Sequence, residues 1–344
     1  MQAIQLAKPH EVRIIEKEIP EPKEGEVRIA VKYLGLCGSD LHMYHGTYGS
    51  PHKYPVIPGH EWSGVVEKLG SNIESFKVGD RVTGDAAMWC GVCPNCAKDK
   101  NMCIDINKRG LTIDGYASEK IILNQKHLYH IPENVDYPLA SINEAFAVSM
   151  HAIHRGMGDK PEDVAEKKVL ILGGGPLGMG IAMLLIRHFG FSKIYVDDIS
   201  EFRKNFAVTI GAKKFQRISG ETNGSKSYRE MYEINGYDFI FESTGVKEVL
   251  DNAFLYVNPL GTIVSLAPIP DIQLRGGLLV LKSVRLTGSL GGTGDFESVL
   301  AAFAEEPDYY GQIISHCFEM SQIKEAFEAQ NADPKRMKIL LRIS

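Results

Sequence analysis

The chain has 344 residues, of which 44% are hydrophobic and 24% charged, and its formal net charge is −5. This length is sufficient for two domains, each with its own hydrophobic core. The mildly acidic charge, without any block of like charges, argues against nucleic acid or a membrane surface as a partner. Lys8, His10 and Glu11 interrupt what would be the apolar part of a signal peptide, so we do not expect export.

The first 132 residues are predicted to form short strands separated by glycine- and proline-containing turns. This spacing is typical of a β-barrel or a partly closed β fold. The expected strands are Glu11–Lys17, Glu26–Lys32, Ser63–Lys68, Arg81–Thr83 and Tyr116–Leu123.

A cysteine-rich loop interrupts this β region. Four of the six cysteines lie within 14 residues, as Cys90, Cys93, Cys96 and Cys103. In a chain without an export signal, such clustering indicates metal rather than disulfides, and it favours the reducing cytoplasm. Four thiolates complete the tetrahedral shell of Zn²⁺, so we predict a structural zinc. The alternative, four free thiols on a surface loop, would be open to oxidation.

From about Pro138 the pattern changes to helix and then to alternating strands and helices. Apolar strands separated by helices predict a parallel sheet covered on both faces, so the fold class is α/β. Residues 169–186 contain several glycines and Pro176, so we expect a strand, a turn and a helix there rather than a membrane span. Expected elements include strands Lys168–Leu172, Lys193–Val196, Tyr237–Glu242, Gly261–Leu266, Ser283–Thr287 and Lys338–Ile343, and helices Pro176–Phe189, Glu201–Ile210, Lys247–Tyr256, Phe296–Glu305 and Ser321–Ala329.

The turn after residue 172 matches the dinucleotide fingerprint G-x-G-x-x-G. Its cofactor-binding residues are Gly173, Gly175, Pro176, Leu177 and Gly178. The glycines allow a tight turn, close approach of a pyrophosphate and contact between helix and strand. The phosphates would then meet the amino end of the helix.

A carboxylate at the end of the next predicted strand also indicates dinucleotide binding. Asp198 follows Gly178 by 20 residues, where a carboxylate accepts hydrogen bonds from the adenosine ribose. It would repel a 2′-phosphate, so NAD is favoured over NADP, although Arg203 could partly offset this preference. A glycine-rich turn that binds no nucleotide is the alternative.

Three further motifs reveal a family resemblance. They are G-L-C-G-S-D-L-H at 35–42, P-G-H-E-W-S-G at 58–64 and N-E-A-F-A-V at 143–148. Together with the cysteine loop and the glycine turn, they resemble the zinc-containing medium-chain alcohol dehydrogenases over nearly the whole chain. The similarity is to the branch that includes sorbitol dehydrogenase and 2-deoxy-scyllo-inosamine dehydrogenase.

The resemblance implies a catalytic zinc in addition to the structural one, hence two zinc ions per chain. Cys37 and His60 match the family's zinc ligands. Glu144 matches the glutamate of the sorbitol branch, and Glu61 lies beside the metal as a direct or exchanging ligand. Which of the two glutamates coordinates zinc in the resting enzyme is left open.

The same resemblance implies a proton path and an orienting carboxylate. Asp40 would orient His60 through its free ring nitrogen. Ser39 would contact the substrate hydroxyl, and His42 occupies the position where the proton leaves. An alcohol on zinc loses its proton more easily, and its hydride can pass to the nicotinamide.

The implied architecture is a GroES-like β domain with an inserted Rossmann domain. The GroES-like catalytic domain would comprise residues 1–145 and 291–344, and the NAD-binding domain residues 146–290. The family suggests a dimer or tetramer. The sequence departs from the family's usual pattern at Ala145, where proline is common, and in the Cys96–Cys103 spacing, which is one residue shorter than is common.

We therefore expect a zinc- and NAD-dependent oxidoreductase that converts a secondary alcohol to a ketone. A polyol, sugar alcohol or cyclitol is the first expectation for the small-molecule substrate. Threonine, a vicinal diol or a sugar phosphate is the alternative with the same chemistry. A non-catalytic nucleotide-binding protein is the alternative of another class, but it has no physical need for the six residues Cys37, Ser39, Asp40, His42, His60 and Glu144 together.

Overall fold

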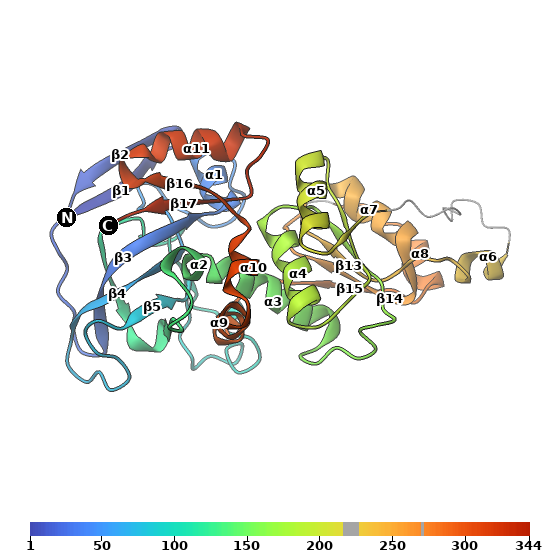
Figure 1. Cartoon of the computed structure of the whole chain (residues 1–344), viewed down its shortest axis with the longest axis horizontal. Helices are drawn as coiled ribbons and strands as arrows, with labels where there is room; N and C mark the ends of the chain where they lie inside the picture. Colours follow the sequence, from blue (N-terminus) through green and yellow to red (C-terminus); the bar gives the residue numbers. More distant parts are fainter. Residues whose placement is uncertain (216–226, 270–271) are drawn as a thin grey trace. The chain divides into compact units, whose positions relative to one another are not determined.

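The computed structural model of the protein describes residues 1–215, 227–269 and 272–344. Its contacts divide the chain into two compact units (Figure 1). The first comprises Met1–Ala147 and Gly291–Ser344, and the second comprises Val148–Leu290. The domain boundaries expected from the sequence stay a prediction, which this division supports.

The second unit contains a six-stranded sheet in which all neighbours are parallel. The strand order is β12-β11-β10-β13-β14-β15. Every residue of the central strand β10 is buried, as expected for a strand covered on both faces. The strands are β10 (Val169–Leu172), β11 (Ile194–Asp197), β12 (Lys213–Lys214), β13 (Tyr237–Glu242), β14 (Val257–Ser265) and β15 (Arg285–Gly288).

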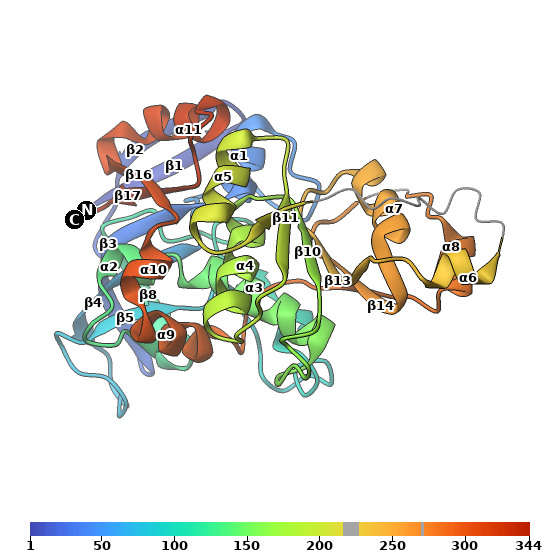
Figure 2. The same cartoon turned by 45° about the vertical axis from the view of Figure 1, so that its right-hand side comes forward.

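Helices connect the strands of this sheet. The helix α4 packs against β10 and β11, and α7 packs against β13 and β14 (Figure 2). Because β10 has β11 on one side and β13 on the other, the strand order reverses there, which is where open α/β sheets bind ligands. The helices are α4 (Pro176–Arg187), α5 (Glu201–Thr209), α6 (Tyr228–Tyr232), α7 (Lys247–Tyr256) and α8 (Gly276–Leu281), preceded by α3 (Asn143–Met157).

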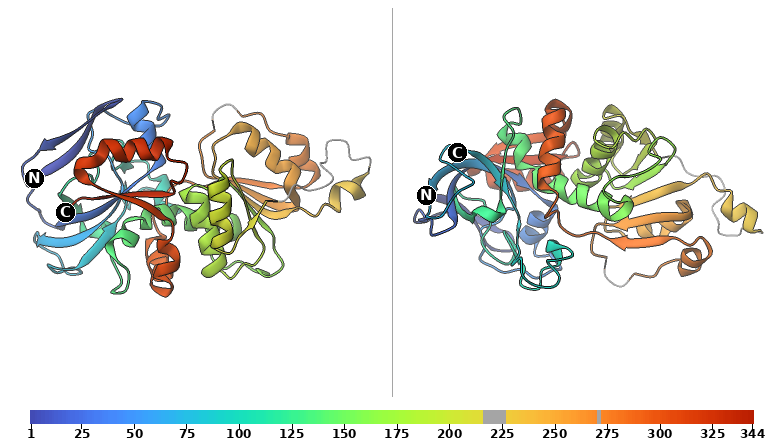
Figure 3. Two further views of the ribbon diagram at one scale, coloured as in Figure 1. Left: turned by 45° about the horizontal axis from the view of Figure 1, so that its top comes forward. Right: turned by 90° about the horizontal axis from the view of Figure 1, so that it is seen from below.

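The first unit is built on a seven-stranded sheet with the order β16-β17-β3-β4-β5-β9, and β8 also pairs with β3. The last strand, β17, is antiparallel to β3, and both chain termini lie close together on this unit in each view (Figure 3). The strands are β1 (Gln2–Lys8), β2 (Glu11–Glu16), β3 (Glu26–Leu36), β4 (Glu61–Leu69), β5 (Arg81–Gly84), β6 (Ala87–Met88), β7 (Asn107–Lys108), β8 (Lys120–Asn124), β9 (Leu128–His130), β16 (Ile314–Glu319) and β17 (Lys338–Arg342).

Short helices complete the first unit. Aliphatic and aromatic side chains from β1, β3, β4, β8, α11 and β17 form its core. None of the helices in residues 1–215, 227–269 and 272–344 is long and apolar enough to span a membrane. The helices are α1 (Gly38–His45), α2 (Tyr137–Ser141), α9 (Phe296–Glu305), α10 (Pro307–Gly311) and α11 (Ile323–Ala332), with the 3₁₀ turns η1 (Lys100–Met102), η2 (Gln125–His127) and η3 (Met320–Gln322).

Most predicted elements are confirmed, several of them to the residue, such as β13, α7 and α9. The strand predicted at Tyr116–Leu123 begins only at Lys120. Tyr116 and Ala117 instead donate their backbone N–H groups to carbonyls of Gly59 and Pro58, 3.0 and 3.1 Å away. The strands β1 and β16 were not predicted; β16 lies at a sheet edge, where alternate residues are exposed.

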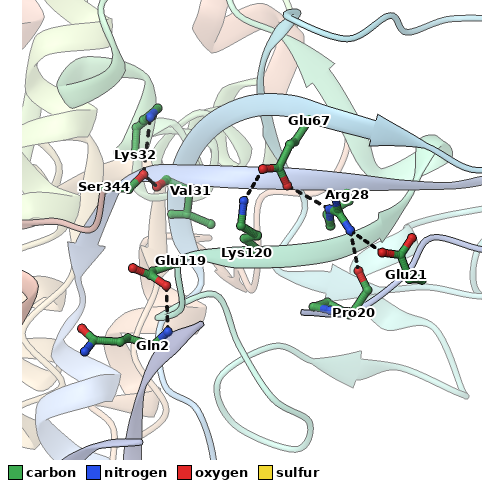
Figure 4. A network of polar contacts seen from close by, with 10 residues as sticks. All are labelled: Gln2, Pro20, Glu21, Arg28, Val31, Lys32, Glu67, Glu119, Lys120 and Ser344. Carbon is green, nitrogen blue, oxygen red and sulfur yellow. Dashed lines mark hydrogen bonds and ion pairs between the residues drawn. The ribbon is translucent and has the colours of Figure 1, made fainter. Parts of the chain in front are cut away.

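A polar network covers the outer face of β3, β4 and β8 (Figure 4). Arg28 donates to the Glu67 carboxylate and to Glu21, each at 2.8 Å, and Lys120 also donates to Glu67. The register shift between Arg28 and Ile29 leaves Glu67 without a pairing partner on β3, and Lys120 pairs with Ala30, two residues from Arg28. The network links three strands to the segment that precedes β3.

Candidate metal centres and nucleotide site

Cys37 and His60 are brought together by the pairing of β3 with β4. The pair Gly35–Glu61 is the last of this ladder, so the residues that follow β3 and precede β4 emerge side by side. Cys37 is the N-cap of α1, and its backbone N–H donates to the Asp40 carboxylate at 2.9 Å. The strand end and the helix cap therefore hold the thiol in place.

The first candidate centre consists of Cys37, His60 and Glu61. One ligand atom from each lies within 4.8 Å of the others. His60 and Glu61 are buried, 7% and 0% exposed. Thiolate, imidazole and carboxylate are the ligand types of zinc sites that keep an open position, so these residues fit the metal.

The charges around His60 also fit a bound cation. Burial disfavours protonation of His60, but negative charge on Asp40, Cys37 and Glu144 outweighs it and keeps the pKa of His60 well above its ordinary value. The neighbourhood of this imidazole thus carries an excess of negative charge. A metal cation would compensate that charge without protonating the ring.

Glu144 lies in the first turn of α3 and is not a member of this three-residue set. Burial raises its pKa to about 7, although His60 acts in the opposite direction. Its charge is felt at His60 and at Lys108. The structure therefore brings Glu61 into the ligand set and leaves Glu144 beside it, and the coordination of either glutamate stays a prediction.

Lys338 is a member of this site that the sequence analysis missed. Its side chain is 2% exposed, and its ammonium group forms an ion pair with Glu61 and donates to the Leu36 carbonyl at 3.1 Å. The residue opens β17, which pairs with the end of β3. A lysine at the start of a C-terminal strand carries no motif, so only the sheet order reveals this contact.

Three polar side chains lie on α1, the helix that Cys37 caps. Asp40 Oδ1 lies 3.8 Å from His60 Nδ1, which faces the carboxylate but is beyond hydrogen-bond distance. Ser39 Oγ lies 3.4 Å from His60 Nε2. His42, on the same helix, is exposed, and its Nδ1 lies 2.9 Å from Thr47 Oγ1. A half-buried hydroxyl and a surface imidazole thus lie about one helical turn apart along α1.

The second candidate centre consists of Cys90, Cys93, Cys96 and Cys103, whose sulfur atoms all lie within 4.8 Å of one another. None of them forms a disulfide. Backbone N–H groups of Ile104 and Cys96 lower the pKa of Cys93 to about 6, which favours the thiolate that a metal requires. The four residues fit a closed tetrahedral zinc site.

A buried carboxylate supports the base of the cysteine loop. Asp85 is fully buried and accepts hydrogen bonds from Trp89 Nε1 at 2.9 Å and from Tyr129 at 3.2 Å. His127 Nδ1 lies 3.1 Å from the same carboxylate. Because Trp89 directly precedes Cys90, this contact connects the loop to the β-sheet.

The glycine turn lies between β10 and α4, at the point where the strand order reverses. A side chain at Gly178 would place its Cβ 1.9 Å from the Gly173 carbonyl, so only glycine fits. Gly175 is the N-cap of α4, with no side-chain cap, and Pro176 begins the helix, followed by Leu177. The amino end of α4 is therefore free to receive an anion.

Asp198 follows β11 and contacts this turn. Its carboxylate accepts hydrogen bonds from the backbone N–H groups of Gly174 and Ser200, both at 2.7 Å. Arg203 lies 3.5 Å from the same carboxylate. The predicted ribose ligand thus also supports the glycine turn, and a cation lies beside it.

Comparisons with known proteins match both units. The sequence model described as an alcohol dehydrogenase GroES-like domain matches residues 23–133, and that of a zinc-binding dehydrogenase matches residues 176–305. A D-altritol 5-dehydrogenase of Agrobacterium fabrum is 28% identical, over 98% of both chains. A scyllo-inosose 3-dehydrogenase of Thermotoga maritima is 30% identical, over 96% of this chain and 90% of its own. An L-threonine 3-dehydrogenase of Deinococcus deserti is 27% identical, over 92% and 91%.

Two solved structures share the whole fold. One, an Escherichia coli alcohol dehydrogenase in complex with NADH, has a TM-score of 0.87 and 28% identity, covering 100% of this chain and 99% of its own. The other, a zinc-binding dehydrogenase of Sinorhizobium meliloti bound to NADP, has a TM-score of 0.86 and 25% identity, covering 99% and 98%. With a GroES-like unit, a Rossmann-like parallel sheet and both sequence models matched, the chain belongs to the zinc-containing medium-chain alcohol dehydrogenase family of oxidoreductases.

Proposed function

We propose that the protein oxidises a secondary alcohol of a polyol, sugar alcohol or cyclitol to a ketone, with NAD as hydride acceptor and two zinc ions per chain. The observation that carries this proposal is the cluster of half-buried Cys37 with buried His60 and Glu61, and the Ser39 hydroxyl 3.4 Å from His60. Its neighbours are the half-buried carboxyl group of Glu144 and the buried ammonium group of Lys338.

The residues of the site divide the work of the reaction among them. Zinc held by Cys37 and His60, with a glutamate, would act as a Lewis acid that makes the substrate hydroxyl more acidic. We expect Ser39 to accept a hydrogen bond from that hydroxyl and to donate its own proton onward as it receives the substrate's. His42, which is exposed on the same helix, would release a proton to solvent.

Asp198 supports NAD as the cofactor. A carboxylate at this position accepts hydrogen bonds from ribose hydroxyls and repels a 2′-phosphate. Arg203, 3.5 Å away, offsets part of that negative charge, so we expect a preference for NAD rather than strict exclusion of NADP. Relatives solved with each cofactor are compatible with such a graded preference.

Two observations favour a polyhydroxylated substrate. Carboxylates at 61 and 144 give an oxygen-rich site, and a polyol can place a second hydroxyl near the metal and gain orientation. The altritol and inosose dehydrogenases among the relatives act on such compounds by their names. Threonine is the second candidate, because an L-threonine 3-dehydrogenase is nearly as similar.

The test is a screen of NAD and NADP reduction across linear polyols, inositols, vicinal diols, threonine and ethanol at alkaline pH. We expect a linear or cyclic polyol to exceed ethanol by about 100-fold or more in kcat/KM, roughly 3 kcal/mol of transition-state stabilisation. Comparable rates on ethanol would contradict the polyol proposal. Strong activity on threonine alone would favour the second candidate.

A further inference from the structure

The cysteine loop contacts a segment 192 residues away through one buried amide. Asn101, in η1 between Cys96 and Cys103, is 4% exposed. Its Oδ1 accepts the backbone N–H of Thr293 at 3.0 Å, and its Nδ2 donates to the Thr293 carbonyl at 3.2 Å. The side chain thus makes the reciprocal pair of bonds that a neighbouring β-strand would make.

The orientation of this amide is set inside the cysteine loop. Asp99 Oδ1 accepts the backbone N–H of Asn101 at 2.8 Å and its Nδ2 at 2.9 Å. Because a carboxylate only accepts, the nitrogen of the Asn101 amide must face Asp99. The position of the Asn101 side chain then depends on the position of η1.

The receiving segment is built to accept this contact. Gly291 has φ +77°, and a Cβ there would lie 2.2 Å from Asn101 Oδ1, so no other residue fits beneath the amide. Thr293 is 8% exposed, and Asp295 then leads into α9. Gly291 is also the residue at which the chain re-enters the first unit after Leu290.

The loop has little apolar content of its own to order it. Val92, Met102 and Ile104 are exposed, at 90%, 41% and 66%. A metal bound by the four sulfur atoms, which lie within 4.8 Å of one another, would therefore be its main cross-link and would order η1.

We propose that the four-cysteine loop is a clamp on the re-entry segment Gly291–Thr293, and that Asn101 is the positioning residue through which the metal-ordered loop holds this segment. The inference goes beyond the proposed function, because it requires neither a particular substrate nor a particular cofactor. Loss of the Asn101 contact should free the Thr293 backbone while leaving the cysteines able to bind zinc.

Hydrogen exchange of the intact, zinc-loaded protein tests the clamp. Asn101→Leu keeps the volume and removes both bonds to Thr293, of which only one protects an amide proton. We expect the Thr293 amide, followed in the peptide covering residues 288–296, to exchange about 10-fold faster, the effect of that one lost hydrogen bond. The matched control is Asn95→Leu, because Asn95 donates to the Met102 carbonyl within the loop and does not touch Thr293. This control should leave peptide 288–296 unchanged.

Two further variants test the clamp, one at the metal site and one at the re-entry segment. Cys93→Ser, which disrupts the metal site but keeps Asn101, should also accelerate exchange in residues 288–296. Gly291→Ala, which leaves the loop sequence intact, should accelerate exchange in residues 97–104. In the double variant Gly291→Ala, Asn101→Ala, exchange there should be slower than in Gly291→Ala, because the clashing atom is removed. Unchanged exchange of residues 288–296 in zinc-retaining Asn101→Leu would overturn the proposal. If that variant loses zinc, unchanged exchange of residues 97–104 in Gly291→Ala would overturn it instead.

Discussion

At the scale of single residues, Asp198 has two roles at the glycine turn. Asp198 supports Gly174 and Ser200 through hydrogen bonds and also carries the charge that should select the cofactor. Asparagine separates these roles in part: it loses the charge and keeps one acceptor oxygen, whereas the Gly174 and Ser200 N–H groups bond to different oxygens of the carboxylate. Two substitutions at one position therefore distinguish support of the turn from recognition of the ribose.

We expect Asp198→Asn to narrow the preference for NAD over NADP about 10-fold while lowering NAD affinity only slightly. Asp198→Ala should narrow the preference equally and weaken NAD binding further, because the Gly174 N–H also loses its acceptor. Titration of both cofactors against each variant measures this. A wild-type protein that prefers NADP would show that the role assigned to Asp198 is wrong and would implicate Arg203.

The buried Glu61–Lys338 pair supports a second prediction at this scale. Both side chains are nearly inaccessible, so removing one leaves the other as an uncompensated buried charge. Lys338→Met should lower the free energy of unfolding by about 3–5 kcal/mol in zinc-depleted protein. The double variant Lys338→Met, Glu61→Met should recover most of that loss. Urea unfolding of the four proteins measures the coupling, and strictly additive losses would contradict it.

At the scale of secondary-structure elements, a buried lysine with a lowered pKa contacts the end of α7. Lys282 is 1% exposed and donates to the carbonyls of Phe254 and Val257, both at 3.0 Å, at the end of α7. Burial lowers the pKa of Lys282 to about 8, against 10.5 for the unperturbed side chain. Between these values the unfolded chain binds more protons than the folded one, so stability should rise with pH.

We therefore expect the free energy of unfolding to gain a positive slope between about pH 8 and 10.5 from this one group. The slope should disappear in Lys282→Met, which cannot titrate. Unfolding by urea at a series of pH values measures both proteins. Identical slopes in the two proteins would contradict the assignment.

The network on β3, β4 and β8 predicts that stability also rises with pH in the acid range. Lys120 and Arg28 lower the pKa of Glu67, so its contribution is present above pH 4.5 and is lost as the pH falls through the lowered value. Glu67→Gln should cost about 1 kcal/mol at pH 7. This difference from the parent should shrink toward zero in acid. Thermal unfolding at pH 7 and pH 3.5 measures it, and a constant difference would exclude the ionic origin.

At the scale of the whole molecule, the candidate metal centres and the glycine turn belong to different compact units. Metal analysis should find close to two zinc ions per chain, and Cys93→Ser should retain about one.

Glu144→Ala should abolish alcohol oxidation, yet NAD should bind with little change, because the glycine turn lies in the other unit. Full activity in Glu144→Ala would remove this residue from the catalytic site.

The sequence alone determined the features that depend on short spacing. The glycine turn, the Cys90–Cys103 loop and the alternation of apolar strands with helices are local patterns, because turn geometry, ligand spacing and helix periodicity each involve few consecutive residues. The resemblance then supplied the family and the ligands Cys37 and His60. Elements without strong periodicity, such as the edge strand β16, escaped prediction.

Only the tertiary structure revealed contacts between residues far apart in the chain. Lys338 reaches Glu61 because β17 pairs with β3, and Asn101 reaches Thr293 because the loop folds onto the re-entry segment. Neither residue belongs to a motif. Burial decides what these contacts mean: a lysine or an asparagine on the surface would be solvated, whereas here each has a specific partner that water cannot replace.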